Sequence, residues 1–348
     1  MDRFPQVFII LVNYKSWQDT IECLESLFKM TYTNFKVVVV DNDSQNDSIE
    51  HIMAWARGSE PISLNGHFYE ATTVASTPIN KPVNCQYIKF RSSENVTLLN
   101  SELVLVESSQ NLGFAGGNNI GISLSLANKA DYVWLLNNDT VVAKDALSNM
   151  IKHINEAKSS NRRLGILGAK LLYYHAPTSI QAILGRYNPL LAKTEHVGFN
   201  LNSDTEFKDL TIKDNDYIVG ASMFVSKDFI QQVGLMAEEY FLYFEELDWV
   251  KRGRKEGYDI DTCLNAIVYH KEGSSIGGGL KDNNNKSQLS DYYSIRNRLI
   301  FTKKFHSNYL LPVYISLIFV AVNRIRRKQF TRVPLILKAI KSSLRSTS

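Results

Sequence analysis

The sequence predicts an α/β fold, in which helices flank a mostly parallel central sheet and a helical extension follows. Short, continuous apolar runs such as Val7–Val12 and Phe35–Val40 are typical of parallel strands that are buried on both faces. These runs alternate with segments whose apolar residues recur at helical spacing, which implies right-handed crossovers between parallel strands. A basic and apolar tail sets residues 276–348 apart from the preceding sheet.

The composition is that of a globular protein with a large core. The 348 residues are 44% hydrophobic and 21% charged, which excludes disordered, collagen-like and low-complexity classes. Cys23, Cys85 and Cys263 lie far apart, which argues against a disulfide scaffold or a cysteine-based zinc site and favours a reducing compartment. The first residues hold a short apolar run without a cleavage site, so we interpret them as a strand and not as a signal peptide.

The other elements of the first half are predicted from the spacing of apolar residues and from residues that begin or end helices and strands. A capping-box-like start at Ser16 predicts the first helix. Further helices are expected over Ser48–Arg57 and from Gly116 to about Asn128, and further strands over Leu103–Val106 and Tyr132–Leu136. The stretch 58–102 holds three prolines and is too long for a plain connection. We therefore expect an insertion there, with a short hairpin near Tyr87–Phe90.

Short strands and loops dominate the second half. The expected strands are Gly165–Leu172, Tyr217–Val225 and Ile260–Tyr269, and the expected helix runs from Glu245 to about Glu256. Gly257 follows this helix at the position where a C-terminal capping glycine belongs.

Polar clusters follow the ends of the predicted strands, which is where open α/β sheets bind ligands. The clusters are Asn13-Tyr14, Asp41-Asn42-Asp43-Ser44, Asn137-Asn138-Asp139 and the glycine-rich stretch Asn111–Asn119, which opens a helix. Glycine permits close backbone approach, and a helix N-terminus favours anions, so the combination predicts a phosphate-bearing ligand. Each cluster taken alone would also suit a turn.

The glycine-rich stretch excludes two common nucleotide-binding motifs. It is neither the G-x-G-x-x-G of dinucleotide enzymes nor a P-loop ending in Gly-Lys-Ser/Thr. Asp139, at the end of an apolar strand, is a candidate ligand for Mg²⁺ or Mn²⁺, because these ions take oxygen donors alongside substrate phosphates. A helix N-cap is the alternative role for this residue.

A second acidic centre, Glu245-Glu246-Leu247-Asp248, follows the aromatic run Tyr240–Phe244. An apolar wall beside paired carboxylates would raise one pKa towards neutrality, as a general base requires. Carboxylates at a helix start also gain from the helix dipole, so capping is the alternative. His270 ends a later strand and is a candidate metal ligand or acid–base group, although a lone histidine is more often structural.

The tail is strongly basic. Twelve Lys and Arg and no acidic residue follow Asp291, although the whole chain has 39 basic and 35 acidic residues. The basic residues enclose the apolar run Tyr309–Val322, which is too short to span a bilayer and is interrupted by Pro312. Apolar plus basic character predicts an anchor on an anionic membrane surface, with an ordinary buried helix as the alternative. No binding motif for nucleic acid is present.

The polar clusters and the acidic centre described above, in this order along the chain, resemble those of the inverting nucleotide-sugar glycosyltransferases of family 2. These enzymes have the Rossmann-like GT-A fold. The resemblance is closest to the rhamnosyltransferase-like branch that builds bacterial surface polysaccharides. The matching segments are Val12–Ser16, Val38–Ser48, Asn111–Ile122, Trp134–Thr140, Val219–Gly234, Phe241–Tyr258, Val268–Gly277 and Tyr292–Phe301. They cover most of the chain apart from the insertion and the tail.

The resemblance implies a donor pocket and a metal site. The residues implied to bind the donor are Asn13, Tyr14, Asp41, Asn42, Asn111, Gly113, Phe114, Gly117, Asn118, Asn137 and Asn138. Asp139 matches the metal-binding aspartate of the DxD-type motif, and His270 matches a histidine that can complete the site for Mg²⁺ or Mn²⁺. Asn137 stands where the motif has its first aspartate, which leaves one certain carboxylate.

The resemblance also implies the catalytic groups. Glu246 stands where the family has a catalytic aspartate and would be the base, with Glu245 and Asp248 as alternatives. Arg296 and Arg298 would contact a diphosphate of the donor or the acceptor, since paired guanidiniums suit phosphate, or they form a basic helix flank. The implied mechanism is a single in-line displacement with inversion at the anomeric carbon.

The resemblance therefore implies a metal-dependent hexosyltransferase with residues 1–275 as its GT-A domain, and the basic, apolar tail predicts a membrane-interface extension over 276–348. The expected donor is dTDP-rhamnose or a UDP-sugar, and the expected acceptor is a polysaccharide or a lipid-linked glycan. The expected location is the cytoplasmic face of a bacterial inner membrane, peripherally bound. The alternative is a catalytically weak protein that binds nucleotide sugar or glycan. A nucleotidyltransferase would need a basic glycine-rich loop directly after the first strand, which is absent.

Overall fold

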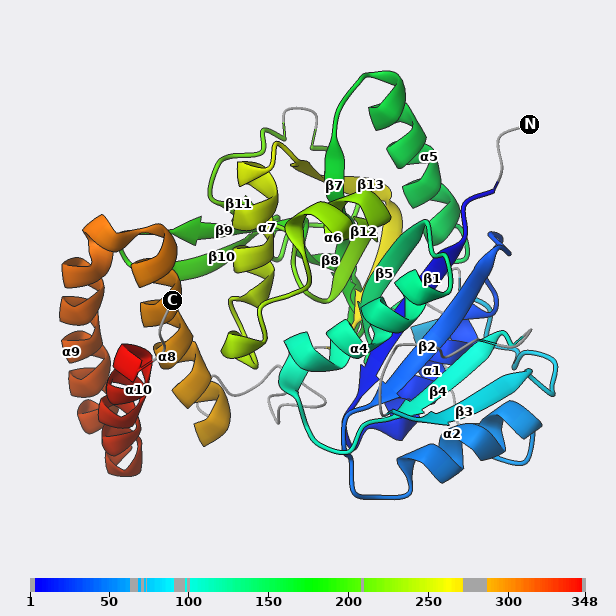
Figure 1. Ribbon diagram of the computed structural model, residues 1–348, viewed down its shortest axis with the longest axis horizontal. Coiled ribbons are helices and arrows are strands. Elements are labelled where there is room, and N and C mark those ends of the chain that lie inside the picture. Colours follow the sequence, from blue (N-terminus) through cyan, green and yellow to red (C-terminus); the bar gives the residue numbers. More distant parts are fainter. Residues whose placement is uncertain are drawn as a thin grey trace.

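The computed structural model describes residues 4–62, 68, 69, 72, 74–90, 98, 101–207, 210–271 and 287–345. Within these residues, a ten-stranded mixed sheet runs in the order β3-β4-β2-β1-β5-β12-β7-β13-β6, and β8 pairs with β7. A smaller sheet has the order β10-β9-β11. The C-terminal helices α8, α9 and α10 stand together at one end of the molecule, far from the N-terminus (Figure 1).

The first half of the chain builds the parallel part of the large sheet. Its elements are β1 Val7–Asn13, α1 Trp17–Leu27, β2 Phe35–Asp41, α2 Ser48–Arg57, β3 Cys85–Lys89, β4 Leu103–Glu107, α4 Gly113–Ala127, β5 Tyr132–Asn137, β6 Thr140–Val142 and α5 Ala146–Ser159. Strand β1 is parallel to β2 and to β5, with Asn13 opposite Asp41 and Val12 opposite Asn137. The register therefore brings the predicted polar clusters to one edge of the sheet.

The second half adds the remaining helices and further strands, which pair antiparallel except that β13 is parallel to β7. Its elements are β7 Leu164–Tyr173, β8 Ala176–Ala182, β9 Leu184–Asn188, β10 Lys193–Val197, β11 Asp216–Tyr217, β12 Ser222–Ser226, α6 Lys227–Val233, η1 Glu238–Tyr240, α7 Glu245–Lys255, β13 Asp259–His270, α8 Gln288–Phe305, η2 Ser307–Tyr309, α9 Leu310–Arg326, η3 Phe330–Arg332 and α10 Val333–Arg345. Gly257 follows α7 with φ +77°, as the predicted C-cap requires.

Three local predictions were wrong. The hairpin expected near Tyr87–Phe90 is a single strand, β3, which lies parallel to β4. The strand expected over Tyr217–Val225 is divided, because β11 joins the small sheet while β12 pairs with β5 and β7. Ser16 occupies the N-cap position of α1 but makes no capping bond through its side chain. The first two errors concern strand pairing, which local sequence does not encode.

Alternate residues of the buried strands belong to two hydrophobic cores, one on each face of the sheet. Val7, Ile9 and Leu11 pack with α1, α2 and α5 on one face, while Phe8 and Ile10 pack with α4 on the other. Helix α4 approaches β1 closely because residue 121 is glycine: a Cβ there would lie 2.5 Å from Cγ2 of Ile10. This close contact places the N-terminus of α4 beside the polar edge of the sheet.

Helix α8 belongs to the same core as the sheet. Leu299 and Phe301 are buried in the cluster that also holds Phe8 and Ile10. Val313 of α9 and Ile336 of α10 are buried in that cluster too, so the three C-terminal helices pack on the body of the protein. The predicted division at residue 275 lies outside the described residues, and the two-part organisation stays a prediction.

Pro312 was expected to interrupt the apolar run, but the helix continues past it. Pro312 lies in the first turn of α9, where a missing backbone N–H leaves no intrahelical bond unmade, and the helix continues to Arg326. The prediction that this run is too short to span a bilayer was wrong as to length, because residues 307–326 are long and apolar enough to cross a membrane by length and composition alone. Among the described residues this is the one such helix, and only 11% of its apolar window is buried.

A fully buried carboxylate ties the insertion to the first helices. Glu25 of α1 accepts hydrogen bonds from Nε1 of Trp55 at 2.9 Å, from the backbone N–H of Ile79 at 2.8 Å and from Nζ of Lys81 at 2.9 Å. Lys81 also lies over the Trp55 ring, 3.6 Å from its centroid. Because Ile79 and Lys81 belong to the segment 58–102, this one side chain anchors that segment.

We expect E25A to destabilise the protein by about 3 kcal/mol, because the substitution leaves the Lys81 ammonium and the Trp55 N–H without their shared acceptor. Urea unfolding measures the change. E156A is the control, since Glu156 and Lys152 form an exposed pair at 4.0 Å that contributes under about 0.5 kcal/mol. Equal effects of the two substitutions would show that Glu25 does not hold the insertion.

Candidate active site

The two polar clusters after β1 and β2 form one hydrogen-bonded unit. Nδ2 of the fully buried Asn13 donates to Oδ2 of Asp41 at 2.7 Å, and the Ser44 hydroxyl donates to the same oxygen at 2.6 Å. Oδ1 of Asn13 accepts from the Thr20 hydroxyl at 2.9 Å. These bonds leave the Asp41 carboxylate in one orientation at the carboxyl edge of the sheet. Tyr14 follows Asn13 there and is half-buried.

Asn42 fixes the glycine-rich loop. Its Nδ2 donates to Oδ1 of Asn111 at 3.1 Å and to the Gly113 carbonyl at 3.0 Å, while its Oδ1 accepts from the Leu112 N–H. A Cβ on residue 117 would lie 2.9 Å from Cγ1 of Val12, so glycine lets the start of α4 lie against β1. The structure therefore brings Asn13, Asp41, Asn42, Asn111, Gly113 and Gly117 together, as predicted.

The start of α4 also contacts the segment that precedes the second acidic centre. The Phe114 N–H donates to the Phe241 carbonyl at 2.7 Å. Gly113 has φ +70°, and a Cβ there would collide with the same carbonyl. Nδ2 of Asn118 donates back to the Phe114 carbonyl at 2.9 Å. The Phe114 N–H at the N-terminus of α4 thus joins this helix to the segment that contains Phe241. Glycine at position 113 permits the close approach.

Asp139 and His270 meet through the pairing of β6 with β13, which places His270 opposite Thr140. Nε2 of His270 lies 3.2 Å from Oδ1 of Asp139 and 3.2 Å from Nδ2 of Asn137. The other ring nitrogen, Nδ1, lies 2.9 Å from Oε1 of Gln181. Because an amide oxygen only accepts, Nδ1 carries the proton of this bond, and Nε2 is turned towards Asp139. Burial alone would raise the pKa of Asp139, but the imidazole and Lys271 hold it below its usual value.

This donor set fits a cation that is shared with a substrate phosphate. Asp139 and His270 are two ligating groups at one point, and the described residues contain no cluster of three or more His, Cys, Asp or Glu that could hold a metal. Mg²⁺ commonly takes one or two carboxylates and completes its shell with substrate phosphates and water. Nδ2 of Asn138 donates to the Thr20 hydroxyl at 2.9 Å, so Asn138 supports α1.

Two adjacent carboxylates begin α7. Glu245 is 3% exposed and Glu246 is half-buried, and within the described ranges Oε2 of each is buried without a hydrogen-bond partner. Burial raises the pKa of Glu246 to about 7, against backbone N–H bonds that lower it. Burial and the neighbouring Glu246 raise the pKa of Glu245 well above its usual value. A carboxylate that titrates near neutrality suits a general base.

Asp248 is held in a different environment. It is fully buried, and it accepts from Nε of Arg252 at 2.6 Å, from Nζ of Lys304 at 2.6 Å and from the Tyr240 hydroxyl at 3.1 Å. These contacts explain its place in the helix as part of an ion-pair network. Of the three predicted candidates for the base, Glu246 alone combines partial exposure with an unengaged oxygen.

The two predicted phosphate-binding arginines differ. Nη1 of Arg296 donates to the Glu239 carbonyl at 2.8 Å and to Oδ1 of Asn297 at 2.7 Å, so this guanidinium is engaged by the protein itself. Nε and Nη1 of Arg298 are buried without a hydrogen-bond partner in the part of the chain that the structure describes. A buried guanidinium without partners is costly, and a bound anion would satisfy it.

Three residues that support these sites were not predicted from the sequence: Thr20, Gln181 and Asn297. Ser44, in contrast, belongs to a predicted polar cluster, and it contacts Asp41 of that cluster. Gln181 lies 89 residues from His270, and Asn297 lies 54 to 57 residues from the carbonyls to which its side chain donates. No spacing in the sequence points to these partners.

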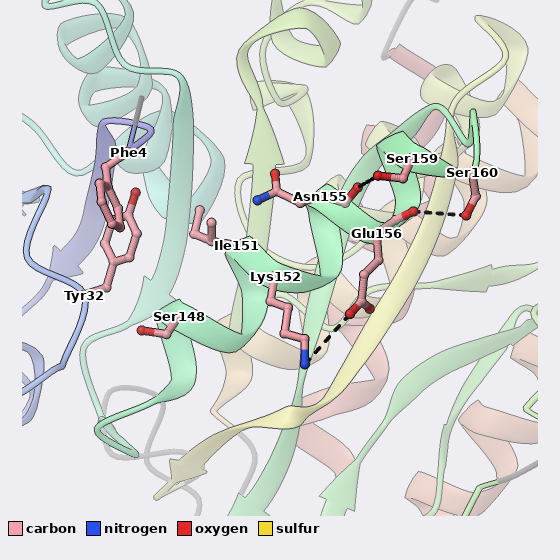
Figure 2. A pocket seen from close by; sticks show the side chains of 9 residues that line it. All are labelled: Phe4, Tyr32, Ser148, Ile151, Lys152, Asn155, Glu156, Ser159 and Ser160. Atoms are coloured by element: carbon pink, nitrogen blue, oxygen red, sulfur yellow. Dashed lines mark hydrogen bonds and ion pairs between the residues drawn. The ribbon is translucent and has the colours of Figure 1, made fainter. Parts of the chain in front are cut away.

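A surface depression elsewhere is unrelated to these groups. It has a volume of about 630 Å³ and is lined by Phe4, Tyr32 and side chains of α5 (Figure 2). Phe4 and Tyr32 precede β1 and β2, so the depression lies at the amino ends of these strands. It contains none of the predicted site residues.

Comparisons with known proteins identify the fold. Residues 8–64 match the family model "Glycosyl transferase family 2". The chain is 22% identical over 300 residues to the low-salt glycan biosynthesis hexosyltransferase Agl10 of Haloferax volcanii, covering 86% of this chain and 76% of the relative. These two matches support a glycosyltransferase.

Two solved structures have a similar fold. The mannosyltransferase PcManGT from Pyrobaculum calidifontis, in complex with GDP-Man and Mn²⁺, has a TM-score of 0.50 at 11% identity over 100% of this chain and 77% of its own. S. aureus TarS 1–349, in complex with UDP-GlcNAc, has a TM-score of 0.50 at 13% identity over 99% of this chain and 82% of its own. The predicted GT-A fold is confirmed, and the rhamnosyltransferase-like branch stays a prediction.

The environment of Glu246 predicts a pH-dependent stability. The folded-state pKa of Glu246 lies above the ordinary value of 4.5. The contribution of this group to stability is therefore fully present below about pH 4.5 and is lost as pH rises through about 7. We expect E246Q to match the wild type at pH 4 and to exceed it by on the order of 2 kcal/mol at pH 8. Denaturant unfolding at both pH values measures this, with E195Q at an exposed glutamate as the control. A difference that does not change with pH would contradict the assignment.

Proposed function

We propose that the protein is an inverting glycosyltransferase that moves a sugar from a nucleotide diphosphate donor to a glycan acceptor. One observation carries the proposal. The carboxylate pair Glu245-Glu246 comes directly after a segment that is hydrogen-bonded to the start of α4, through the Phe114 N–H and the Phe241 carbonyl. A group suited to activate a hydroxyl and an edge suited to bind a nucleotide are thus built as one unit.

The proposed donor is a nucleotide-activated hexose. Asn13, Asp41 and Asn42, with the glycine-rich loop, would hold the nucleoside and its phosphates. The support is the match to a hexosyltransferase and the similarity of fold to proteins in complex with GDP-Man and UDP-GlcNAc. The sequence resemblance favours dTDP-rhamnose, and a UDP-sugar is the other candidate.

Asp139 and His270 would hold a Mg²⁺ or Mn²⁺ ion together with the diphosphate. When bound, such an ion supplies positive charge that stabilises the departing nucleoside diphosphate. Gln181 orients the imidazole by accepting the Nδ1 proton, and the lowered pKa of Asp139 keeps its carboxylate charged at neutral pH. Asn137 lies beside the imidazole in place of a second carboxylate.

Glu246 would take the proton of the acceptor hydroxyl as that oxygen attacks the anomeric carbon. The new bond from the acceptor oxygen to this carbon forms as the bond to the diphosphate oxygen breaks on the opposite side, which inverts the configuration. Glu245 would be the member of the pair that stays protonated, because burial and the neighbouring Glu246 raise its pKa well above the usual value. The pair would therefore carry one negative charge at neutral pH, on the more exposed member.

The unpaired guanidinium of Arg298 would bind a phosphate of the acceptor. Its neighbour Tyr187 packs against Phe244, which directly precedes the carboxylate pair, with ring centroids 6.1 Å apart. Arg298 therefore stands on the α8 side of the same region. A phosphorylated acceptor, such as a glycan on a lipid diphosphate, would satisfy this charge.

Helix α9 would place the protein on the cytoplasmic face of a bacterial inner membrane. One of its faces is a continuous exposed apolar stripe: Leu311, Ile315, Ile318, Phe319, Val322 and Ile325. The opposite face packs on the protein through Val313 and Leu317. The exposed basic residues Arg326, Arg327 and Lys328 follow the stripe, as anionic lipid headgroups would require. A helix with one face held by the protein is suited to lie along the interface.

The transferase activity is tested on purified protein with a panel of UDP-, GDP- and dTDP-sugars, with Mn²⁺, with Mg²⁺ and with chelator. We expect metal-enhanced binding of one donor, and a turnover that rises with pH to a plateau above about pH 7. In E246Q, turnover should fall by about 100-fold or more while donor affinity stays within about twofold. E195Q is the control. Binding without turnover in the wild type would instead indicate a nucleotide-sugar-binding protein.

Membrane attachment is tested by flotation with vesicles. We expect the wild type to float with phosphatidylglycerol vesicles and not with phosphatidylcholine vesicles, because the basic residues favour anionic headgroups. The double variant L311E/F319E places charges at two side chains that are each 70% exposed, and it should stay in the soluble fraction. F199E changes a 54% exposed aromatic residue elsewhere and should float like the wild type. Flotation of the double variant would overturn the proposed membrane face.

A further inference from the structure

The segment Tyr240–Phe244 enters α7 in an unfavourable backbone conformation. Phe241, Tyr243 and Phe244 have φ values of +62°, +71° and +79°, a region that bulky L-residues rarely adopt. Phe244 is the N-cap of α7, so its conformation sets the direction in which Glu245 and Glu246 leave the helix start. Such a conformation persists only where surrounding contacts impose it.

Asn297 of α8 supplies these contacts. It is fully buried, and its Nδ2 lies 2.7 Å from the Tyr240 carbonyl, 2.8 Å from the Leu242 carbonyl and 3.0 Å from the Tyr243 carbonyl. One side-chain amide thus collects three carbonyl oxygens of the strained segment. The carbonyls converge because the backbone is turned, so the bonds and the conformation depend on each other.

Arg296 fixes the orientation of this amide. Its Nη1 donates to Oδ1 of Asn297 at 2.7 Å and to the Glu239 carbonyl at 2.8 Å. The amide oxygen therefore faces the guanidinium, and the amide N–H groups face the segment. An aspartate in this place would turn a carboxylate oxygen towards the three carbonyls, and leucine would satisfy neither side. Asparagine meets both requirements within the available space.

The other side of the segment rests on the start of α4. The Phe241 carbonyl accepts the Phe114 N–H, and the Phe241 ring stacks on Tyr293 of α8 with centroids 4.7 Å apart. The segment is thus clamped between the glycine-rich loop and α8. A shift of α8 would move the carboxylate pair relative to the predicted donor site.

We propose that Asn297, oriented by Arg296, is a positioning residue for the carboxylate pair, and that α8 is part of the active-site machinery. Among the described residues, the hydrogen bonds of the Asn297 side chain go to Arg296 and to backbone carbonyls of this segment, so we infer that it acts through the placement of Glu245 and Glu246. The inference rests on the proposed function, in which Glu246 is the base. It goes beyond that function by assigning the base's geometry to a helix from the C-terminal part of the chain.

The experiment compares N297A with N149A in the full-length protein. Nδ2 of Asn149 also donates to a backbone carbonyl, that of Asn265 at 2.7 Å, but far along the chain from the carboxylate pair. With the donor found in the panel, we expect N297A to lower kcat by about 30- to 100-fold while the donor KM stays within about twofold. N149A should change neither. N297Q keeps the amide and should recover part of the lost kcat.

A second readout does not depend on turnover. Carbon-13 NMR of labelled glutamate side chains follows the titration of the pair, with E245Q and E246Q for assignment. In N297A the inflection near pH 7 should move towards 4.5, because a released segment exposes the carboxylates to water. R296K keeps the positive charge but loses the forked guanidinium, so the inflection should move in the same direction by a smaller amount. If N297A does not fold, R296K takes its place in this measurement.

The two readouts separate the possible failures. If no sugar is transferred but the titration shifts, the positioning role stands and the proposed reaction is wrong. If N297A and R296K titrate like the wild type, or if N297A keeps wild-type kcat and loses only stability, the positioning role is wrong whatever the reaction is.

Discussion

The candidate active site depends on five residues of backbone, Tyr240–Phe244, that the protein holds against their own conformational preference. Three of them have positive φ without being glycine, and the free energy for this comes from contacts on two sides. The Phe114 N–H holds one side and Asn297 holds the other. Because the same segment joins both, the glycine-rich loop and the carboxylate pair cannot move independently.

The two acidic centres of the candidate site have pKa values that shift in opposite directions. Asp139 is buried beside His270 and Lys271, which keep its pKa low and its charge in place. Glu245 is buried and Glu246 is half-buried beside it, and loss of solvation raises the pKa of both carboxyl groups. A permanently charged carboxylate suits a cation, and one that titrates near neutrality suits proton transfer. The surroundings of each group suit the division of roles that the motifs predict, and these roles stay a prediction.

Local sequence predicted the features that are encoded locally. Buried apolar runs gave β1 and β2, and Gly257 gave the end of α7, because periodicity and glycine conformation act over a few residues. The polar clusters met as expected, because parallel strands bring their carboxyl ends to one edge. The partner of Tyr87–Phe90 and the roles of Gln181 and Asn297 depend on contacts that only the folded chain creates. Periodicity carries no information about which distant carbonyl an amide will reach.

The C-terminal helices connect the proposed membrane face to the proposed base. Asp291 of α8 pairs with Arg324 at 2.9 Å and with Arg332, and Nε of Arg296 contacts the Ser342 hydroxyl of α10 at 3.3 Å. The helix that carries Asn297 is therefore braced by the two helices that follow it. If α9 lies on lipid, then α8 is fixed relative to the membrane, and the segment before Glu245 is fixed relative to α8. A lipid-linked acceptor would then approach a base whose position is set from the membrane side, which gives one physical reason for a basic, apolar tail on a nucleotide-binding fold.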